Sequence, residues 1–75
     1  MKAYVLIHVR AGAIPEAVRN ISRLEGVQEA HMTFGPYDVV ATVNANDVAH
    51  LGRLIANQIQ PIPGVIDTMT CLVAD

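Results

Sequence analysis

The sequence has few of the residues that small domains use for cross-links and few of those that bind nucleic acids. It contains one cysteine, Cys71, so no disulfide can form within the chain, and its histidines do not complete a zinc-binding pattern. The basic residues are few and scattered, at Lys2, Arg10, Arg19, Arg23 and Arg53. Nucleic-acid binding requires a concentrated basic surface. We therefore expect no metal site and no direct contact with DNA or RNA.

Long hydrophobic runs are also absent. No segment approaches the roughly 18 consecutive apolar residues of a membrane span. The first residues resemble a signal peptide only loosely, because His8 and Arg10 interrupt the apolar run. Cleavage after Ala13 would also remove a segment with the pattern of a strand. We expect a cytoplasmic protein with no membrane association.

The length and composition favour a single domain, residues 1–75, that associates with further subunits. A chain of 75 residues buries a small core. Domains of this size usually need a cross-link, a metal or a partner for stability. Hydrophobic residues make up 52% of the chain, and the mean hydropathy is +0.35. This is more apolar surface than one small core needs, so we expect an oligomer.

Hydrophobic periodicity predicts four strands and two helices. Alternating or continuous apolar runs predict strands at residues 3–10, 27–34, 37–44 and 65–74. Three- and four-residue spacing predicts a first helix through Ile14, Ala17, Val18, Ile21 and Leu24, and a second through Val48, Leu51, Ile55, Ile59 and Ile62. Pro15 suits a first helical turn, and Pro61 and Pro63 would end the second helix. Asn46 is the expected N-cap of that helix, followed by Asp47 in its first turn.

The predicted order, β-α-β-β-α-β, is that of an α+β ferredoxin-like sandwich. A weak internal repeat supports it, because "LEGV" at residues 24–27 recurs as "IPGV" at residues 62–65. In this fold both helices cover one face of an antiparallel sheet. The other face would carry Tyr4, Leu6, Val40 and Thr42, and exposed apolar patches usually mark interfaces. We expect a dimer that packs sheet against sheet.

The segment Gly35-Pro36-Tyr37-Asp38 connects the second and third predicted strands and has two interpretations. As a turn, it uses Gly for a positive φ, Pro for a fixed φ and Asp for a local side-chain hydrogen bond. As a binding loop, it would direct backbone N–H groups at a carboxylate. Asp38 would then hold an ammonium group and Tyr37 would wall a side chain. That combination suits an α-amino acid.

The remaining polar residues indicate no catalytic site. A catalytic histidine needs a partner within hydrogen-bond reach, and no such pairing is visible for His8, His31 or His50. Surface or interface positions are the expectation for all three. Cys71 lies in an apolar strand, where cysteine generally packs as a small hydrophobic residue.

Residues 26–73, GVQEAHMTFGPYDVVATVNANDVAHLGRLIANQIQPIPGVIDTMTCLV, resemble the ligand-binding (RAM) half of the Lrp/AsnC transcription regulators. The specific parts are the Gly-x-Tyr-Asp turn at residues 35–38, the helix ending "IQPIPGV" and the final strand "DTMTCLV". Each part is degenerate alone, but their order and spacing are specific, and the resemblance covers essentially the whole chain.

The resemblance implies a non-enzymatic module that needs no cofactor. Family members bind effectors, typically amino acids, in clefts between dimers of a ring-like, often octameric assembly. The implied ligand-binding residues are Gly35, Pro36, Tyr37, Asp38, Gln60, Thr68 and Thr70. Pro36 replaces a residue that is often acidic or polar in the family and removes one N–H, which leaves the effector's identity open.

Full-length family members carry an N-terminal helix-turn-helix domain, whereas only Met1 and Lys2 precede the first predicted strand here. The resemblance therefore implies a stand-alone module that modulates transcription by assembling with full-length paralogues. Two alternatives stay open. One is a small dimeric α+β-barrel enzyme of the cofactor-independent monooxygenase or isomerase type, which a cavity lined by His31 between sheet and helices would favour. The other is an assembly module without a working ligand site.

Overall fold

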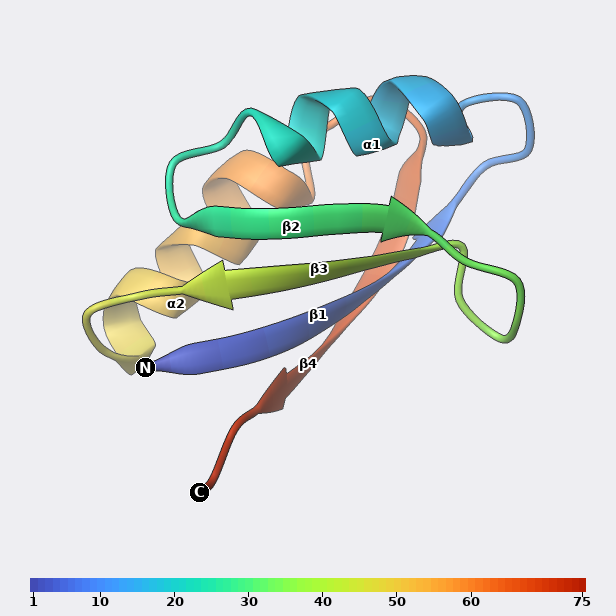
Figure 1. Cartoon of the computed structure of the whole chain (residues 1–75). Helices are drawn as coiled ribbons and strands as arrows, with labels where there is room; N and C mark the ends of the chain where they lie inside the picture. The colour runs from blue at the N-terminus through green and yellow to red at the C-terminus, as the bar shows by residue number, and fades with distance from the viewer.

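The computed structural model describes residues 1–75. The elements are β1 (Lys2–Val9), α1 (Ile14–Ser22), β2 (Val27–Met32), β3 (Val39–Asn44), α2 (Val48–Leu54), the π-helix η1 (Ile55–Ile59) and β4 (Val65–Leu72). The strands form one antiparallel sheet in the order β2-β3-β1-β4. Figure 1 shows α1 along one edge and α2 behind the sheet. The predicted ferredoxin-like α+β fold is confirmed.

Alternation along the two central strands builds the core. In β1 every second residue from Ala3 to Val9 is buried, and β3 buries Val39, Ala41 and Val43. The helices complete the core with Ala17, Ile21, Leu51, Leu54, Ile55 and Ile59. Every buried residue is apolar. Because fully burying an aliphatic side chain stabilises by about 1.5–3 kcal/mol, this layer between sheet and helices holds the helices on one face.

The start of α2 differs from the sequence-based prediction. Asp47, not Asn46, is the N-cap, and its Oδ1 accepts a hydrogen bond from the His50 N–H at 2.7 Å. Asn46 lies one residue earlier, and its N–H donates to His50 Nδ1 at 3.0 Å. The first bond satisfies one of the free N–H groups at the helix start, and the second ties the residue before the N-cap to the same histidine. His50 therefore stabilises a helix end.

The second predicted helix is not α-helical throughout. It widens into η1, where the Gln60 N–H donates to Ile55 O at 2.9 Å. A π-turn carries one extra residue per turn, and both Ile55 and Ile59 remain buried. The last three strands are also shorter than predicted. Residues 33–38 form a loop, and Phe34 is fully exposed instead of lying on the same strand face as Ala30.

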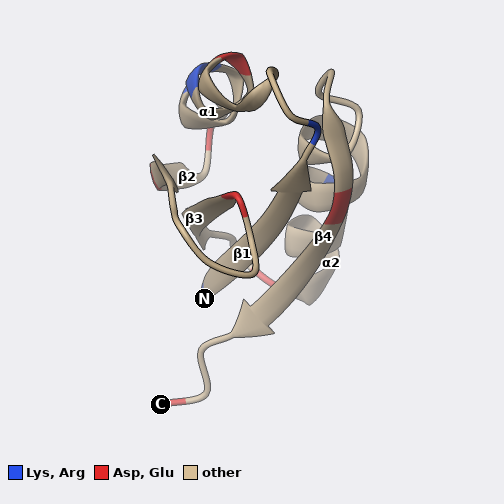
Figure 2. Cartoon of the chain, turned by 90° about the vertical axis from the view of Figure 1, so that its right-hand side faces the viewer, with Lys and Arg blue, Asp and Glu red and all other residues tan.

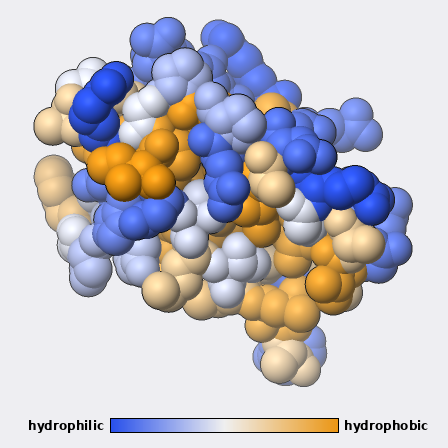
Figure 3. Space-filling view, turned by 180° about the vertical axis from the view of Figure 1, so that it is seen from behind, coloured by the Kyte–Doolittle hydropathy of each residue, from blue (hydrophilic) through white to orange (hydrophobic).

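Charged residues do not gather on one face. Figure 2 shows basic and acidic positions spread over several elements, with both kinds present on α1. On the side seen from behind in Figure 3, where α2 lies toward the viewer, polar atoms alternate with hydrophobic groups, the largest of them at the upper left and lower right. Neither helix has the length and apolar character needed to cross a bilayer.

Candidate functional site

The face of the sheet opposite the helices, here called the outer sheet face, carries a row of apolar and small polar side chains. Strand register places Leu6 between Val40 and Met69, and Tyr4 between Thr42 and Cys71. Tyr4, Met69 and Cys71 are exposed. Cys71 thus lies on an open apolar face rather than in the core. No helix covers this face, as expected from the sequence.

The loop at residues 33–38 is closed by hydrogen bonds across its base. The Thr33 N–H donates to Asp38 O at 2.9 Å, and Thr33 Oγ1 donates to Tyr37 O at 2.8 Å. Gly35 has a φ of +153°, a value that favours glycine. We refer to residues 35–38 as the GPYD turn. Hydrogen bonds within the chain hold the shape of this turn without a ligand.

Asp38 attaches the GPYD turn to β1. The Val9 N–H donates to Asp38 Oδ2 at 2.8 Å, and the Asp38 N–H donates to Ile7 O at 3.0 Å. The carboxylate thus continues the sheet pairing at the point where β3 begins. This leaves Asp38 Oδ1 without a hydrogen bond within the chain.

His8 makes the second attachment, which the sequence analysis did not find. His8 Nδ1 lies 2.6 Å from Asp67 Oδ1, and His8 Nε2 lies 2.7 Å from Pro36 O. The Tyr37 ring stacks on the imidazole, with centroids 4.2 Å apart and 13° between the planes. The hydrogen bond to Pro36, followed by that to Asp67, raises the pKa of His8 above its usual value of 6.5. The only sequence signal for His8 was its position on the outer sheet face in line with Tyr4 and Leu6.

A shallow cavity of about 400 Å³ lies between the loop and the outer sheet face. Its lining comprises Leu6, Thr33, Phe34, Gly35, Pro36, Tyr37 and Val40. Tyr37 also donates its hydroxyl proton to Met69 Sδ at 3.3 Å. The cavity thus joins three GPYD-turn residues to the apolar surface of the sheet.

The other predicted site residues lie on the opposite side of the sheet. Gln60 Nε2 donates to Thr68 Oγ1 at 3.2 Å, so the structure brings these two residues together. Register pairs Thr68 with Ile7 and Thr70 with Val5, which places both threonines on the helix-facing side of β4. Within one chain, therefore, the predicted residues form two groups, the GPYD turn on one face and Gln60 with the threonines on the other.

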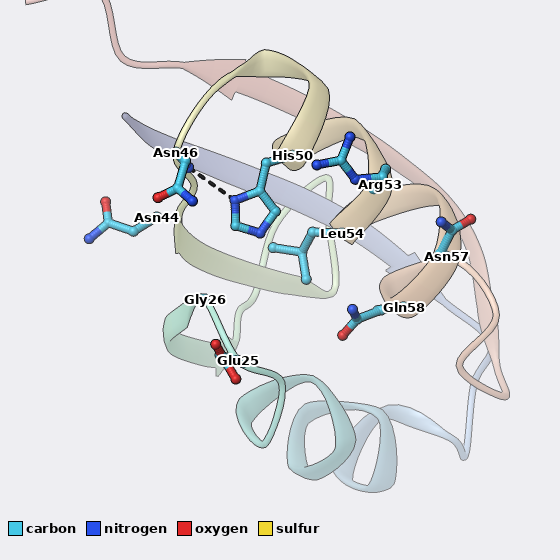
Figure 4. Close-up of a pocket in the computed structure, with 9 residues that line it drawn as sticks. All are labelled: Glu25, Gly26, Asn44, Asn46, His50, Arg53, Leu54, Asn57 and Gln58. Atoms are coloured by element: carbon cyan, nitrogen blue, oxygen red, sulfur yellow. Dashed lines mark hydrogen bonds between the residues drawn. The ribbon is translucent and has the colours of Figure 1, made fainter.

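A larger cavity of about 570 Å³ lies between the end of α1 and the α2–η1 helix (Figure 4). Its lining is almost entirely polar: Glu25, Gly26, Asn44, Asn46, His50, Arg53, Leu54, Asn57 and Gln58. It contains none of the predicted site residues. Because His50 Nδ1 accepts the Asn46 N–H, a neutral His50 carries its proton on Nε2.

The arrangement that would favour the enzyme alternative is not found. His31 lies on the outer sheet face, where its Nε2 is 3.2 Å from Glu29 Oε1 and both side chains are exposed. It lines none of the cavities of the chain. The side chains that are buried between sheet and helices are all apolar.

Comparison with known proteins identifies the family. The model of the Lrp/AsnC ligand binding domain matches residues 2–75. The HTH-type transcriptional regulator FL11 of Pyrococcus abyssi is 34% identical over 73 residues, which are 97% of this chain and 48% of FL11. The chain thus spans about half the length of such curated relatives.

Solved structures agree with this match. The crystal structure of TTHA0845 from Thermus thermophilus superposes with a TM-score of 0.94 at 34% identity, covering 99% of this chain and 92% of that one. The transcriptional regulator NMB0573 of Neisseria meningitidis, solved as an L-Met complex, has a TM-score of 0.88 over 99% of this chain and 49% of its own. At 16% identity, the second likeness concerns the fold alone. This chain belongs to the family of Lrp/AsnC ligand-binding domains.

Proposed function

We propose that this chain binds a small effector, an amino acid, at the GPYD turn and so modulates transcription through assembly with other subunits. Family membership and the regulator FL11 support a regulatory, effector-binding and non-enzymatic role. The L-Met complex of the Neisseria regulator supports the choice of an amino acid, since that protein shares the fold.

The observation that carries the proposal is a pre-shaped turn with unused polar groups beside an apolar cavity. The Tyr37 N–H makes no hydrogen bond within the chain, and Asp38 Oδ1 has no partner either. An effector's carboxylate would accept from the N–H, and its ammonium group would contact Asp38. The part of the cavity beside Phe34 and Pro36 would take an apolar side chain. Because the turn is already ordered, little of the binding free energy is lost in ordering it.

We infer that two subunits complete the site. The GPYD turn lies on the outer face, whereas Gln60, Thr68 and Thr70 lie on the helix-facing side. One small molecule would contact both groups when the turn comes from one subunit and Gln60 with the threonines comes from another. Effector binding would then favour one assembly over another, because a ligand shifts an equilibrium by its difference in affinity for the two states.

The proposed assembly begins with a dimer through the outer sheet face. Tyr4, Leu6, Val40 and Met69 supply its apolar surface. Further association, as a ring of dimers such as an octamer or with a full-length paralogue, would bring the turn of one dimer to the threonines of the next. We place this activity in the cytoplasm, where transcription regulators act.

A thermal-shift screen against the twenty amino acids at millimolar concentration tests the proposal. A site filled at about a hundred times its dissociation constant adds about 2.7 kcal/mol to the free energy of unfolding. For a domain of this size, each kcal/mol raises Tm by roughly 4–8 °C. We expect one amino acid, or a related group of them, to give such a shift.

A matched pair of variants locates the site. Gln60→Ala should abolish the shift, and Gln58→Ala should retain it, because Gln58 lines the separate polar cavity. A screen in which no amino acid raises Tm would favour an assembly module without a working ligand site. A shift that Gln60→Ala retains and Gln58→Ala abolishes would move the site to the polar cavity.

A further inference from the structure

His8 holds the GPYD turn and β4 at the same time, and its geometry requires a particular protonation state. Nδ1 faces Asp67 Oδ1 at 2.6 Å, and Nε2 faces Pro36 O at 2.7 Å. A backbone carbonyl and an ionised carboxylate only accept hydrogen bonds. Neutral imidazole has one N–H, whereas the imidazolium ion has two. Both contacts therefore form together only when the His8–Asp67 pair carries one proton more than a neutral His8 beside an ionised Asp67.

The surroundings of His8 favour that proton. The charged groups that act on it are Asp67 from β4 and Asp38 from the end of the GPYD turn, and both are acidic. From the turn, the Tyr37 ring lies parallel to the imidazole at 4.2 Å. A cation over an aromatic face is attracted to the ring. Both the elements beside β1 and the stacked ring thus stabilise the cationic form.

The Pro36 contact also directs a donor of the proposed site. The chain has no cis peptide bonds, so the Pro36 carbonyl and the Tyr37 N–H point in opposite directions. Holding the carbonyl on His8 fixes this peptide plane and points the N–H away from the imidazole. This N–H is the group that the proposed function assigns to the effector's carboxylate.

We propose that protonated His8 is a positioning residue that locks the GPYD turn against β4 and thereby makes effector binding dependent on pH. This inference rests on the proposed function for the effector. When His8 loses its proton, one of the two contacts is lost, and Pro36 is the neutral and weaker partner. The peptide plane is then free to rotate. Effector affinity falls as pH rises through the pKa of His8. If the bound effector raises that pKa by one unit, the affinity is about tenfold lower at high pH than at low pH.

The first test uses the protein without effector. Imidazole chemical shifts would give the pKa of His8, and the chemical shift of the Tyr37 amide nitrogen would report the environment of that amide, between about pH 5 and pH 9. We expect the amide environment to change with the pKa of His8. In His8→Gln the change should disappear, and in Asp67→Asn it should move to lower pH. In the control His31→Gln it should persist, since His31 contacts Glu29 and not the turn. A Tyr37 amide that does not respond as His8 titrates would overturn the inference.

The second test measures affinity against pH for the amino acid that gives the largest thermal shift in the screen. Affinity that falls with rising pH in the wild type and in His31→Gln, but is flat in His8→Gln, supports the coupling. Affinity independent of pH in the wild type overturns the coupling and leaves the proposed function intact. A screen that is flat at every pH overturns the proposed function, while the effector-free titration still decides whether His8 positions the turn.

Discussion

Asp38 and Val9 are joined by a part-buried hydrogen bond in which the Val9 N–H donates to Asp38 Oδ2 at 2.8 Å. The Asp38 N–H donates in turn to Ile7 O. The aspartate that the family resemblance assigns to the effector thus also extends the pairing between the two central strands, β3 and β1. A variant of Asp38 would therefore lose ligand binding both through the missing contact to the effector and through the weakened strand pairing. A measurement of stability separates the two causes.

Asp38→Ala should destabilise the domain. It removes the acceptor of the Val9 N–H, and a part-buried donor left without a partner costs about 1–3 kcal/mol. Because each kcal/mol corresponds to roughly 4–8 °C in a domain this small, thermal unfolding would resolve the change. Asp38→Asn keeps an acceptor oxygen and should lose less stability while losing its attraction for an ammonium group. Equal melting temperatures for wild type and Asp38→Ala would contradict the structural role.

Leu6→Asp should convert the protein to a monomer. Leu6 lies at the centre of the outer sheet face, between Val40 and Met69. Burying an unpaired charge in an apolar interface is strongly unfavourable. Sedimentation velocity would give the molar mass, and circular dichroism would verify the fold. Val48→Asp is the control, since Val48 is an exposed apolar residue that lies on α2, away from the outer sheet face. An unchanged mass for Leu6→Asp would place the interface elsewhere.

Periodicity in the sequence was sufficient to predict the order of the elements. Ala17 and Ile21 follow helical spacing, and Val5, Ile7 and Val9 alternate as in a half-buried strand, so each predicted element had one apolar side to bury. The boundaries were less predictable. Residues 33–38 have the composition of strand ends, but the bonds of Thr33 to Asp38 and Tyr37 close them into a loop.

The geometry of the candidate site could be predicted only in part. The GPYD turn is a local signal and was found as such. His8, Pro36 and Asp67 are far apart in the sequence, with 28 and 59 positions separating His8 from its partners. No local pattern reveals such a contact, because it arises from strand order. The division of the predicted residues between two sheet faces also depends on register, which places Thr68 opposite Ile7.

Stability should depend on pH through His8. The hydrogen bonds to Pro36 and Asp67 raise its pKa in the folded protein above the unfolded value of 6.5. The folded state then binds the proton more tightly, so these contacts stabilise fully below about pH 6.5 and lose their effect as pH rises through the raised pKa. The difference in Tm between wild type and His8→Gln should accordingly be largest in acid and smallest at alkaline pH, where neutral His8 keeps only one of the two hydrogen bonds. A difference that is constant between about pH 5 and pH 9 would show that His8 contributes by packing alone.

Gly64→Ala and Gly52→Ala should change stability in opposite directions. Gly64 has a φ of +93°, and an added Cβ would lie 2.5 Å from Ala13 Cβ. The left-handed backbone costs a non-glycine residue about 1–2 kcal/mol, and the clash with the start of α1 adds to this. Gly52 lies within α2 with no atom within 4 Å of an added Cβ. There, alanine's helix propensity should add about 0.8–1 kcal/mol. Urea unfolding of both variants would measure the two effects against one reference. If Gly64→Ala proved as stable as wild type, the close contact between the β4 entry and the start of α1 would be wrong. If Gly52→Ala were destabilising, α2 would not be an open helical surface at that position.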